Sequence, residues 1–259
     1  MKTPEIVPEK IDSQINVKII ILIVFSAIAF QLVINNLLDL DNSELISSIV
    51  SIINPLAASI AGFIISYRYR RSLIFGKSYL LLSFGFLSVF FGEITYLIYD
   101  LVLGIEPYPS IADVFFFAYS PLLIGHLIIN IRFFQPTTKI ITKIWVISIP
   151  IIIITTYGLL SIYQIGEMNF DFYYGIIFVL AISITLSLTI LGAKIFKEGT
   201  LGKSWLILVF GVLSLTLGDS IYYYLEILES YDLTHPVNLL WYAGYWIVVY
   251  ALLKHKETI

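Results

Sequence analysis

Residues 78–103 read SYLLLSFGFLSVFFGEITYLIYDLVL, and residues 204–229 read SWLILVFGVLSLTLGDSIYYYLEILE. Both runs are long enough to cross a bilayer, because a spanning helix needs about 20 predominantly apolar residues. Each run also contains a carboxylate in its second half, Glu93 in the first and Asp219 in the second. The two runs therefore predict transmembrane helices that hold an acidic group inside the membrane.

The two runs repeat one pattern, in which Ser204 corresponds to Ser78 at a displacement of 126 residues. Small residues, carboxylates and tyrosines coincide at this displacement, in the pairs Gly85 and Gly211, Ser88 and Ser214, Gly92 and Gly218, Glu93 and Asp219, Tyr96 and Tyr222, and Asp100 and Glu226. Such regularity predicts an internal duplication with four helices in each copy. Because four is an even number, both copies cross the membrane in the same sense, and the repeat is parallel.

The rest of the chain is equally apolar. Of its 259 residues, 59% are hydrophobic and only 13% are charged, and the mean hydropathy is +0.92. A water-soluble domain of this size does not carry such a composition. The sequence therefore predicts an all-α polytopic membrane protein with eight transmembrane helices, at about 18–38, 46–67, 78–103, 111–133, 141–163, 172–194, 204–229 and 236–253.

The distribution of charge predicts how these helices are oriented. All 15 Lys and Arg residues lie near the two termini or at the joints that follow the second, fourth and sixth predicted helices, and the other joints contain only acidic charge. Because short basic loops stay in the cytoplasm, we expect a multi-pass protein of the cell membrane with both termini cytoplasmic. Its expected parts are a cytoplasmic N-terminal segment at 1–17, four-helix membrane repeats at 18–133 and 134–253, and a cytoplasmic tail at 254–259.

Glu93 and Asp219 are predicted to lie in the outer third of the membrane. Glu93 follows Lys77, which marks the inner boundary, by 16 residues, and Asp219 follows Lys203 by the same number. At about 1.5 Å per residue, this is roughly 24 Å into a core about 30 Å thick. No basic residue is available on that side, and an ionised carboxylate that faces lipid is costly. Each group must therefore be protonated, accept hydrogen bonds, or face a wet cavity or a bound cation.

The surroundings of the two carboxylates predict an outward-facing acidic and aromatic pocket for a ligand or a cation. In each run a tyrosine follows the carboxylate by three residues and a second carboxylate follows it by seven, which places each set on one helical face. The candidate binding residues are Glu93, Asp219, Tyr96, Tyr222, Asp100, Glu226, Asp113 and Tyr119.

These residues also have structural interpretations. Glu93 and Asp219 fit a buried, hydrogen-bonded pair that holds the two halves together as well as they fit a binding site. Asp100, Glu226 and many of the tyrosines fit the outer aromatic belt of a membrane protein. For these residues the sequence leaves binding and packing as alternatives.

The start of the fourth predicted helix has a capping pattern. Ser110 is followed three residues later by Asp113, which is typical of a capping box. Thr234 with Pro236 fits a similar start for the eighth helix. For Asp113 the sequence therefore favours helix capping, with pocket lining as the alternative.

The histidines and the absence of catalytic motifs restrict the metal-binding and enzymatic functions that the chain can have. We expect His126 to be a buried, hydrogen-bonded imidazole. For His235 at the outer mouth, a metal site shared with Asp113 and Glu226 is an open alternative, which a single histidine supports only weakly. The chain has no cysteine and contains neither an H-E-x-x-H nor a G-x-S-x-G motif. We therefore expect no enzyme and no cofactor, with an intramembrane lipid enzyme as a minor alternative.

A resemblance to a known class rests on three short motifs: Gly92-Glu93 with Tyr96, Pro109-Ser110-Ile111-Ala112-Asp113 with Tyr119, and Gly218-Asp219 with Tyr222. These motifs resemble the multi-helix membrane input regions of prokaryotic sensor histidine kinases and diguanylate cyclases. The resemblance implies a module that senses a ligand or the state of the membrane. The chain departs from the pattern at Glu93, where an aspartate is usual, and it ends at Ile259 without a kinase or cyclase output domain.

We therefore expect a non-enzymatic integral membrane protein of sensory-module type. Its expected partners are the lipid bilayer and either a separate membrane signalling protein or a second copy of the chain, and no nucleic acid. The alternative function is a small cation or proton-coupled transporter or channel, which the parallel repeat and the paired carboxylates support.

Overall fold

The computed structural model describes residues 15–135, 137, 139–198 and 203–255. Within these residues the chain is all-helical, with eight α-helices, one π-helical turn and no strand. The elements are α1 (Val17–Leu37), α2 (Leu40–Arg68), α3 (Phe75–Leu97), η1 (Ile98–Val102), α4 (Ile111–Phe134), α5 (Ile140–Ile165), α6 (Phe170–Glu198), α7 (Lys203–Ile227) and α8 (Asn238–Lys254). The predicted all-α fold class is confirmed for the described part of the chain.

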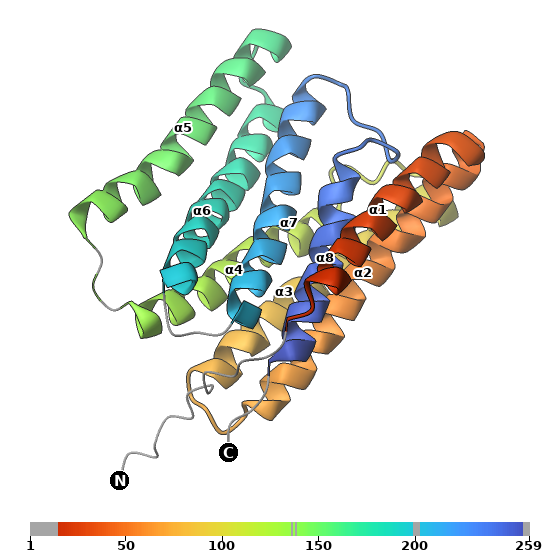
Figure 1. Cartoon of the computed structure of the whole chain (residues 1–259). Helices are drawn as coiled ribbons and strands as arrows, with labels where there is room; N and C mark the ends of the chain where they lie inside the picture. The colour runs from red at the N-terminus through yellow and green to blue at the C-terminus, as the bar shows by residue number, and fades with distance from the viewer. Residues whose placement is uncertain (1–14, 136, 138, 199–202, 256–259) are drawn as a thin grey trace.

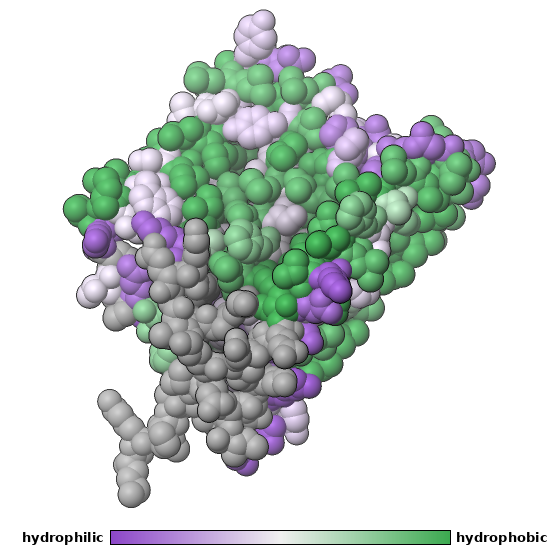
Figure 2. All heavy atoms as spheres, viewed as in Figure 1, coloured by the Kyte–Doolittle hydropathy of each residue, from purple (hydrophilic) through white to green (hydrophobic). Residues whose placement is uncertain are grey.

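Seven of these helices are long and apolar enough to cross a membrane, namely α1 to α7. The eighth, α8, has 17 residues, which at about 1.5 Å per residue gives roughly 25 Å. On the face shown in Figure 2, hydrophobic residues cover the sides of the helices, and hydrophilic residues gather toward the two ends of the bundle. Length and composition therefore fit a multi-pass membrane protein.

Six helices form a closed ring. In ring order α2 packs on α3, then α4, α6, α7 and α8, and α8 packs on α2 again (Figure 1). Outside the ring, α5 lies on α6 and α7, and α1 lies on α8 with a smaller contact to α2. α3 and α7 occupy opposite positions in the ring, so their backbones do not pack against each other. Residues on these two helices can contact one another only through their side chains.

Large aromatic side chains fill the interior of the ring. The rings of Tyr79 on α3 and Trp205 on α7 lie 5.6 Å apart between centroids. Farther along α3, the ring of Phe86 lies 5.7 Å from that of Tyr245 on α8. Aromatic contacts at these separations stabilise packing beyond the area they bury. These aromatic side chains fill the space between the backbones of helices in the ring.

Glycines allow α3 to approach α4 and α7 to approach α8. A Cβ added at Gly92 would lie 2.6 Å from the ring of Phe116, and one added at Gly218 would lie 2.7 Å from the indole nitrogen of Trp241. In the sequence, Ser88 and Gly92, and likewise Ser214 and Gly218, are small residues four apart, a spacing that predicts close helix approach in a membrane. The structure confirms the packing role of both glycines. In each case the partner is the next helix along the chain.

The predicted start of α2 is six residues too late. The helix begins at Leu40 because the Asp39 carboxylate accepts a hydrogen bond from the backbone N–H of Asn42 at 3.2 Å, which caps the N-terminus. Asp41 adds a negative charge to the first turn, where the helix dipole favours it. Acidic residues that the sequence assigns to a joint therefore begin the helix instead.

The predicted start of the last helix is also corrected. It begins at Asn238, not at residue 236, and Thr234 does not cap it, because the Thr234 hydroxyl bonds to Asp232 at 2.6 Å. The imidazole of His235 instead accepts a hydrogen bond from the backbone N–H of Val237 at 3.1 Å. A ring nitrogen thus fills the place expected for a threonine oxygen.

The packing of α7 on α8 predicts that Gly211→Ala destabilises the protein. The added Cβ would lie 2.9 Å from the backbone nitrogen of Val248, which has no flexible end to move away. Overpacking of this kind costs about 1–3 kcal/mol, so the midpoint of thermal unfolding in detergent should fall. Gly158→Ala is the matched control, because its Cβ would meet nothing nearer than Ile176 at 3.5 Å. Equal midpoints for the two variants would contradict the expectation.

Candidate functional site

The two intramembrane carboxylates come from opposite sides of the ring and belong to one electrostatic neighbourhood. Glu93 on α3 and Asp219 on α7 are both half-buried. Asp219 is among the groups whose charge acts on Glu93, and both carboxylates act on Tyr245 of α8. The predicted pair therefore gathers at one region of the ring, toward the ends of α3 and α7 that lead to η1 and to the loop after α7.

The two carboxylates differ in their hydrogen bonding. The indole N–H of Trp241 on α8 donates to Asp219 Oδ1 at 2.8 Å. The absence of a side chain at Gly218 makes room for this indole against α7. At the corresponding place beside Gly92 stands Phe116, which has no N–H to give. Within the described residues the Glu93 carboxylate has no hydrogen-bond partner, so Asp219 is held in place and Glu93 is available.

A buried hydroxyl lies next to the carboxylates. Tyr119 of α4 is 7% exposed, and its hydroxyl has no hydrogen-bond partner among the described residues. Asp219 is the charged group that acts on this hydroxyl, and the Tyr119 ring packs on Phe86 at 5.8 Å. A buried polar group without a partner costs about 1–3 kcal/mol. The site therefore contains a donor that a bound molecule would satisfy.

Three aromatic side chains form one wall of the site. The ring of Tyr222 lies 4.8 Å from that of Tyr231 and 6.0 Å from that of Trp241. Tyr231 comes from the loop between α7 and α8, and burial raises the pKa of its hydroxyl, with Glu93 and Glu226 adding to the shift. This hydroxyl therefore stays protonated and able to donate a hydrogen bond at neutral pH.

Two of the predicted acidic residues, in η1 and near the end of α7, are exposed. Asp100 and Glu226 are exposed, and Tyr96 is 40% exposed. From Ile98 onward the hydrogen bonding of the chain changes from α to π, so the α-helical spacing that placed Asp100 on the face of Glu93 no longer applies. For Asp100 and Glu226 this position fits the interfacial alternative.

Asp113 has the capping role that the sequence favours. Its Oδ2 accepts a hydrogen bond from the Ser110 backbone N–H at 2.6 Å, and the Ser110 hydroxyl accepts one from the Ala112 N–H at 3.1 Å. The capping box at the start of α4 is therefore confirmed. The Asp113 carboxylate therefore stabilises the N-terminus of α4, the helix on which Tyr119 lies in the ring interior.

The expected metal arrangement is not formed. Among the described residues, no group of three or more His, Cys, Asp or Glu side chains is placed to hold a metal ion. The imidazole of His235 is engaged with the backbone of Val237, and Asp113 caps α4. The proposal that His235, Asp113 and Glu226 surround a metal is therefore wrong for this structure.

A second polar cluster lies at the opposite end of the ring. His126 is 3% exposed, its Nδ1 lies 2.8 Å from the Ser78 hydroxyl, and Asn130 Nδ2 donates to the same hydroxyl at 2.6 Å. The expectation of a buried, hydrogen-bonded His126 is confirmed. Around it, Tyr79 Oη, Asn130 Oδ1 and His255 Nε2 are buried and have no partner among the described residues.

Sequence reasoning missed Trp241 and Tyr231 as parts of the site. A signal for Trp241 exists, because a displacement of 125 residues, one fewer than for α3 and α7, pairs Phe116 with Trp241. Tyr231 lies in a loop, where helical spacing gives no information. Of the predicted residues, the structure brings together Glu93, Asp219, Tyr119 and Tyr222, and Tyr96 and Glu226 act electrostatically on Tyr222. It leaves Asp100 exposed in η1 and uses Asp113 to cap α4.

Comparison with known proteins identifies no related protein. No family model matches the chain, and no curated protein and no solved structure matches it. The assignment of the site therefore rests on its geometry.

The buried imidazole of His255 predicts that acid destabilises the protein. Burial lowers its pKa from 6.5 to about 4, so between these values the unfolded chain binds a proton that the folded chain does not. Stability from this group is therefore complete above pH 6.5 and is lost as the pH falls toward 4. The limiting slope is about 1.4 kcal/mol per pH unit.

The measurement is the unfolding midpoint at several pH values between 7.5 and 4.5, for the wild type and for His255→Gln. The variant should show the smaller decline, because glutamine does not titrate. Identical declines would assign the acid sensitivity to other groups.

Proposed function

We propose that this chain is a non-enzymatic integral membrane protein of sensory-module type, with a site around Glu93 and Asp219 that binds a small ligand carrying positive charge. The observation that carries the proposal is that an unpartnered Glu93 carboxylate and the buried, unpartnered Tyr119 hydroxyl both lie within the electrostatic reach of Asp219. Neither 78–131 nor 204–253 contains a lysine or arginine to neutralise the site. A cation from outside would supply the missing positive charge, and the Tyr119 hydroxyl oxygen would coordinate it or accept a hydrogen bond from an ammonium N–H.

The chemistry of the site favours an organic ammonium or a single monovalent cation over a multivalent metal. Tyr222, Tyr231 and Trp241 present aromatic rings beside the carboxylates. The faces of such rings attract cations, most strongly where water is excluded. A multivalent metal would need more oxygen or nitrogen ligands than the described residues bring together.

We also propose a topology for the chain. It has eight membrane spans arranged as two parallel four-helix repeats, with both termini in the cytoplasm of a cell-membrane protein. Two inter-half contacts support the repeat, because α2 packs on α8 and its counterpart α6 packs on α4. The Gly92–Phe116 and Gly218–Trp241 contacts match in the same way. In this proposed topology the 17 residues of α8 form the eighth span.

Two hydrogen bonds support the common location of the termini. The backbone N–H of Asn16, before α1, donates to the Tyr250 hydroxyl near the end of α8 at 2.9 Å. Arg68 at the end of α2 lies 3.4 Å from the carbonyl of His255. The start of α1 and the ends of α2 and α8 are thus at one end of the bundle, which carries basic charge and fits the cytoplasmic side.

A cation or proton-coupled transporter or channel is the second candidate. The observation in its favour is the presence of unpartnered polar atoms at both ends of the ring interior, Tyr119 at one end and Tyr79, Asn130 and His255 at the other. Against an open route, the rings of Phe86, Tyr119 and Tyr245 pack together between the two ends. This filling favours a closed binding site.

Glu93→Gln is expected to weaken the binding of an ammonium probe such as tetramethylammonium at least tenfold. The substitution removes the charge that faces the site and keeps the side-chain volume. The measurement is calorimetric titration of the protein in detergent, with Glu106→Gln as the control, because it removes a carboxylate from an exposed position of the loop before α4. Wild-type affinity in Glu93→Gln would refute the site.

Flux measurements separate the two candidate functions. In proteoliposomes with a proton or potassium gradient, the sensory proposal predicts no flux above that of empty vesicles. Flux that disappears in the double variant Glu93→Gln, Asp219→Asn would replace the sensor with the transporter.

The topology is testable because the chain contains no cysteine. A single cysteine at Glu106 should react with a membrane-impermeant maleimide in intact cells, since we place this loop outside. A single cysteine at Arg71 should react only after permeabilisation. The opposite labelling pattern would invert the orientation.

A further inference from the structure

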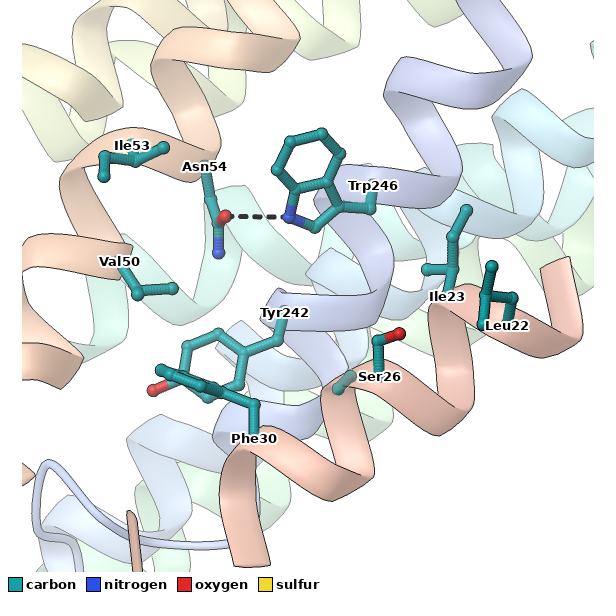
Figure 3. Close-up of a pocket in the computed structure, with 10 residues that line it drawn as sticks. Leu22, Ile23, Ser26, Phe30, Val50, Ile53, Asn54, Tyr242 and Trp246 are labelled. Carbon is teal, nitrogen blue, oxygen red and sulfur yellow. Dashed lines mark hydrogen bonds between the residues drawn. The ribbon is translucent and has the colours of Figure 1, made fainter. Parts of the chain in front are cut away.

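A groove on the outer surface of the bundle lies between α1, α2 and α8, apart from the carboxylate site. It has a volume of about 400 Å³ and is lined mainly by aliphatic and aromatic side chains (Figure 3). Three of its lining residues, Leu22, Ile53 and Trp246, are 64%, 49% and 44% exposed. Because α1 and α2 are among the membrane-spanning helices, the mouth of the groove opens toward the lipid.

One polar side chain is built into this apolar groove. Asn54 of α2 is 3% exposed, and the indole N–H of Trp246 donates to its Oδ1 at 3.1 Å. An indole nitrogen is only a donor, so this bond fixes which end of the amide is oxygen. The amide nitrogen is thereby directed into the groove, between Val50 and Tyr242 (Figure 3).

This donor has no acceptor among the described residues. In hydrocarbon there is no water to take its place, and an unsatisfied polar group is costly. The chain keeps a pre-oriented N–H donor at a position where only a molecule entering from the membrane can accept its hydrogen bond.

The depth of Asn54 restricts what that molecule is. The residue stands 14 positions from either end of the 29-residue helix α2, and is therefore close to the middle of the membrane. The hydrocarbon core extends about 15 Å to each side of this plane. The ester carbonyls of phospholipids lie at the edge of the core and do not reach it, whereas their acyl chains have no acceptor.

Aromatic side chains flank the donor. The ring of Phe30 on α1 meets that of Tyr242 on α8 edge-on, with 5.1 Å between centroids. Together with the indole of Trp246, these rings suit a flat, conjugated group better than a flexible chain. The volume of the groove is within the range of small-molecule sites, about 300–1,000 Å³.

We propose that this groove binds a membrane-soluble quinone, with a ring carbonyl accepting the hydrogen bond of Asn54 Nδ2 and the isoprenoid tail remaining in the lipid. A quinone combines the required properties, because it is flat, apolar and carries an acceptor oxygen that is stable at the centre of a bilayer. The proposal is independent of the carboxylate site, and no electron transfer is part of it.

The test is titration of the purified protein in nanodiscs with a decyl-substituted benzoquinone, followed by quenching of tryptophan fluorescence. Decylbenzene, which has the same tail and no acceptor, is the reference compound. Because it does not quench tryptophan, the two compounds are compared by the shift they cause in the thermal unfolding midpoint. We expect saturable quenching by the quinone and a midpoint shift with the quinone alone. Asn54→Leu should raise its dissociation constant at least tenfold, because leucine keeps the volume and lacks the donor.

Asn36→Leu is the matched control, since it makes the same substitution at an exposed position of α1 outside the groove. Ser26→Phe, at an exposed lining position, fills the groove without disturbing the interior and should abolish saturation. Glu93→Gln should bind the quinone like the wild type, which separates this site from the cation site.

Either of two results would overturn the proposal. Equal behaviour of the quinone and decylbenzene would mean that the groove accommodates a lipid chain only. An unchanged dissociation constant in both Asn54→Leu and Ser26→Phe, in protein that elutes as the wild type does in gel filtration, would place the quinone elsewhere.

Discussion

The structure depends on how polar groups are satisfied where no water reaches them. A carboxylate or amide in the membrane interior needs a partner from its own chain or from a bound molecule. Asp219 obtains one from the indole of Trp241, and His126 obtains one from Ser78. Glu93, Tyr119 and the nitrogen of Asn54 do not, and the two sites proposed above are built on these three groups.

The ring arrangement makes these exceptions accessible to different kinds of ligand. Because α3 and α7 are opposed across the ring, their carboxylates meet in an interior that aromatic side chains close on the other side. The Asn54 amide is on the outside of the same ring, where α1 leaves a groove toward the lipid. The two proposed sites therefore have different surroundings, one in the ring interior and the other on the outer surface of the bundle.

Much of the fold is predictable from the sequence, because long apolar runs and small residues in helical register have few other solutions in a membrane. The helix-packing glycines at 92 and 218, the capping box at Ser110 and the buried His126 follow from local rules and are confirmed. The start of α2 was placed too late, since Asp39 and Asp41 read equally well as loop or as helix cap. The side chains that surround the two carboxylates could not be predicted from the sequence, for a different reason. Trp241 and Tyr231 come from a separate helix and a loop, and their positions follow from tertiary packing.

The attachment of α1 has a consequence for the relation between the two sites. This helix is outside the ring and is fastened near both ends, by Asn16 to the Tyr250 hydroxyl and by Gln31 to the carbonyl of Thr234. Thr234 belongs to the same loop as Tyr231, which forms part of the aromatic wall beside Glu93. The same loop therefore joins α1, and with it the groove, to the aromatic wall beside Glu93, so that a movement at one of the two proposed sites would be transmitted to the other.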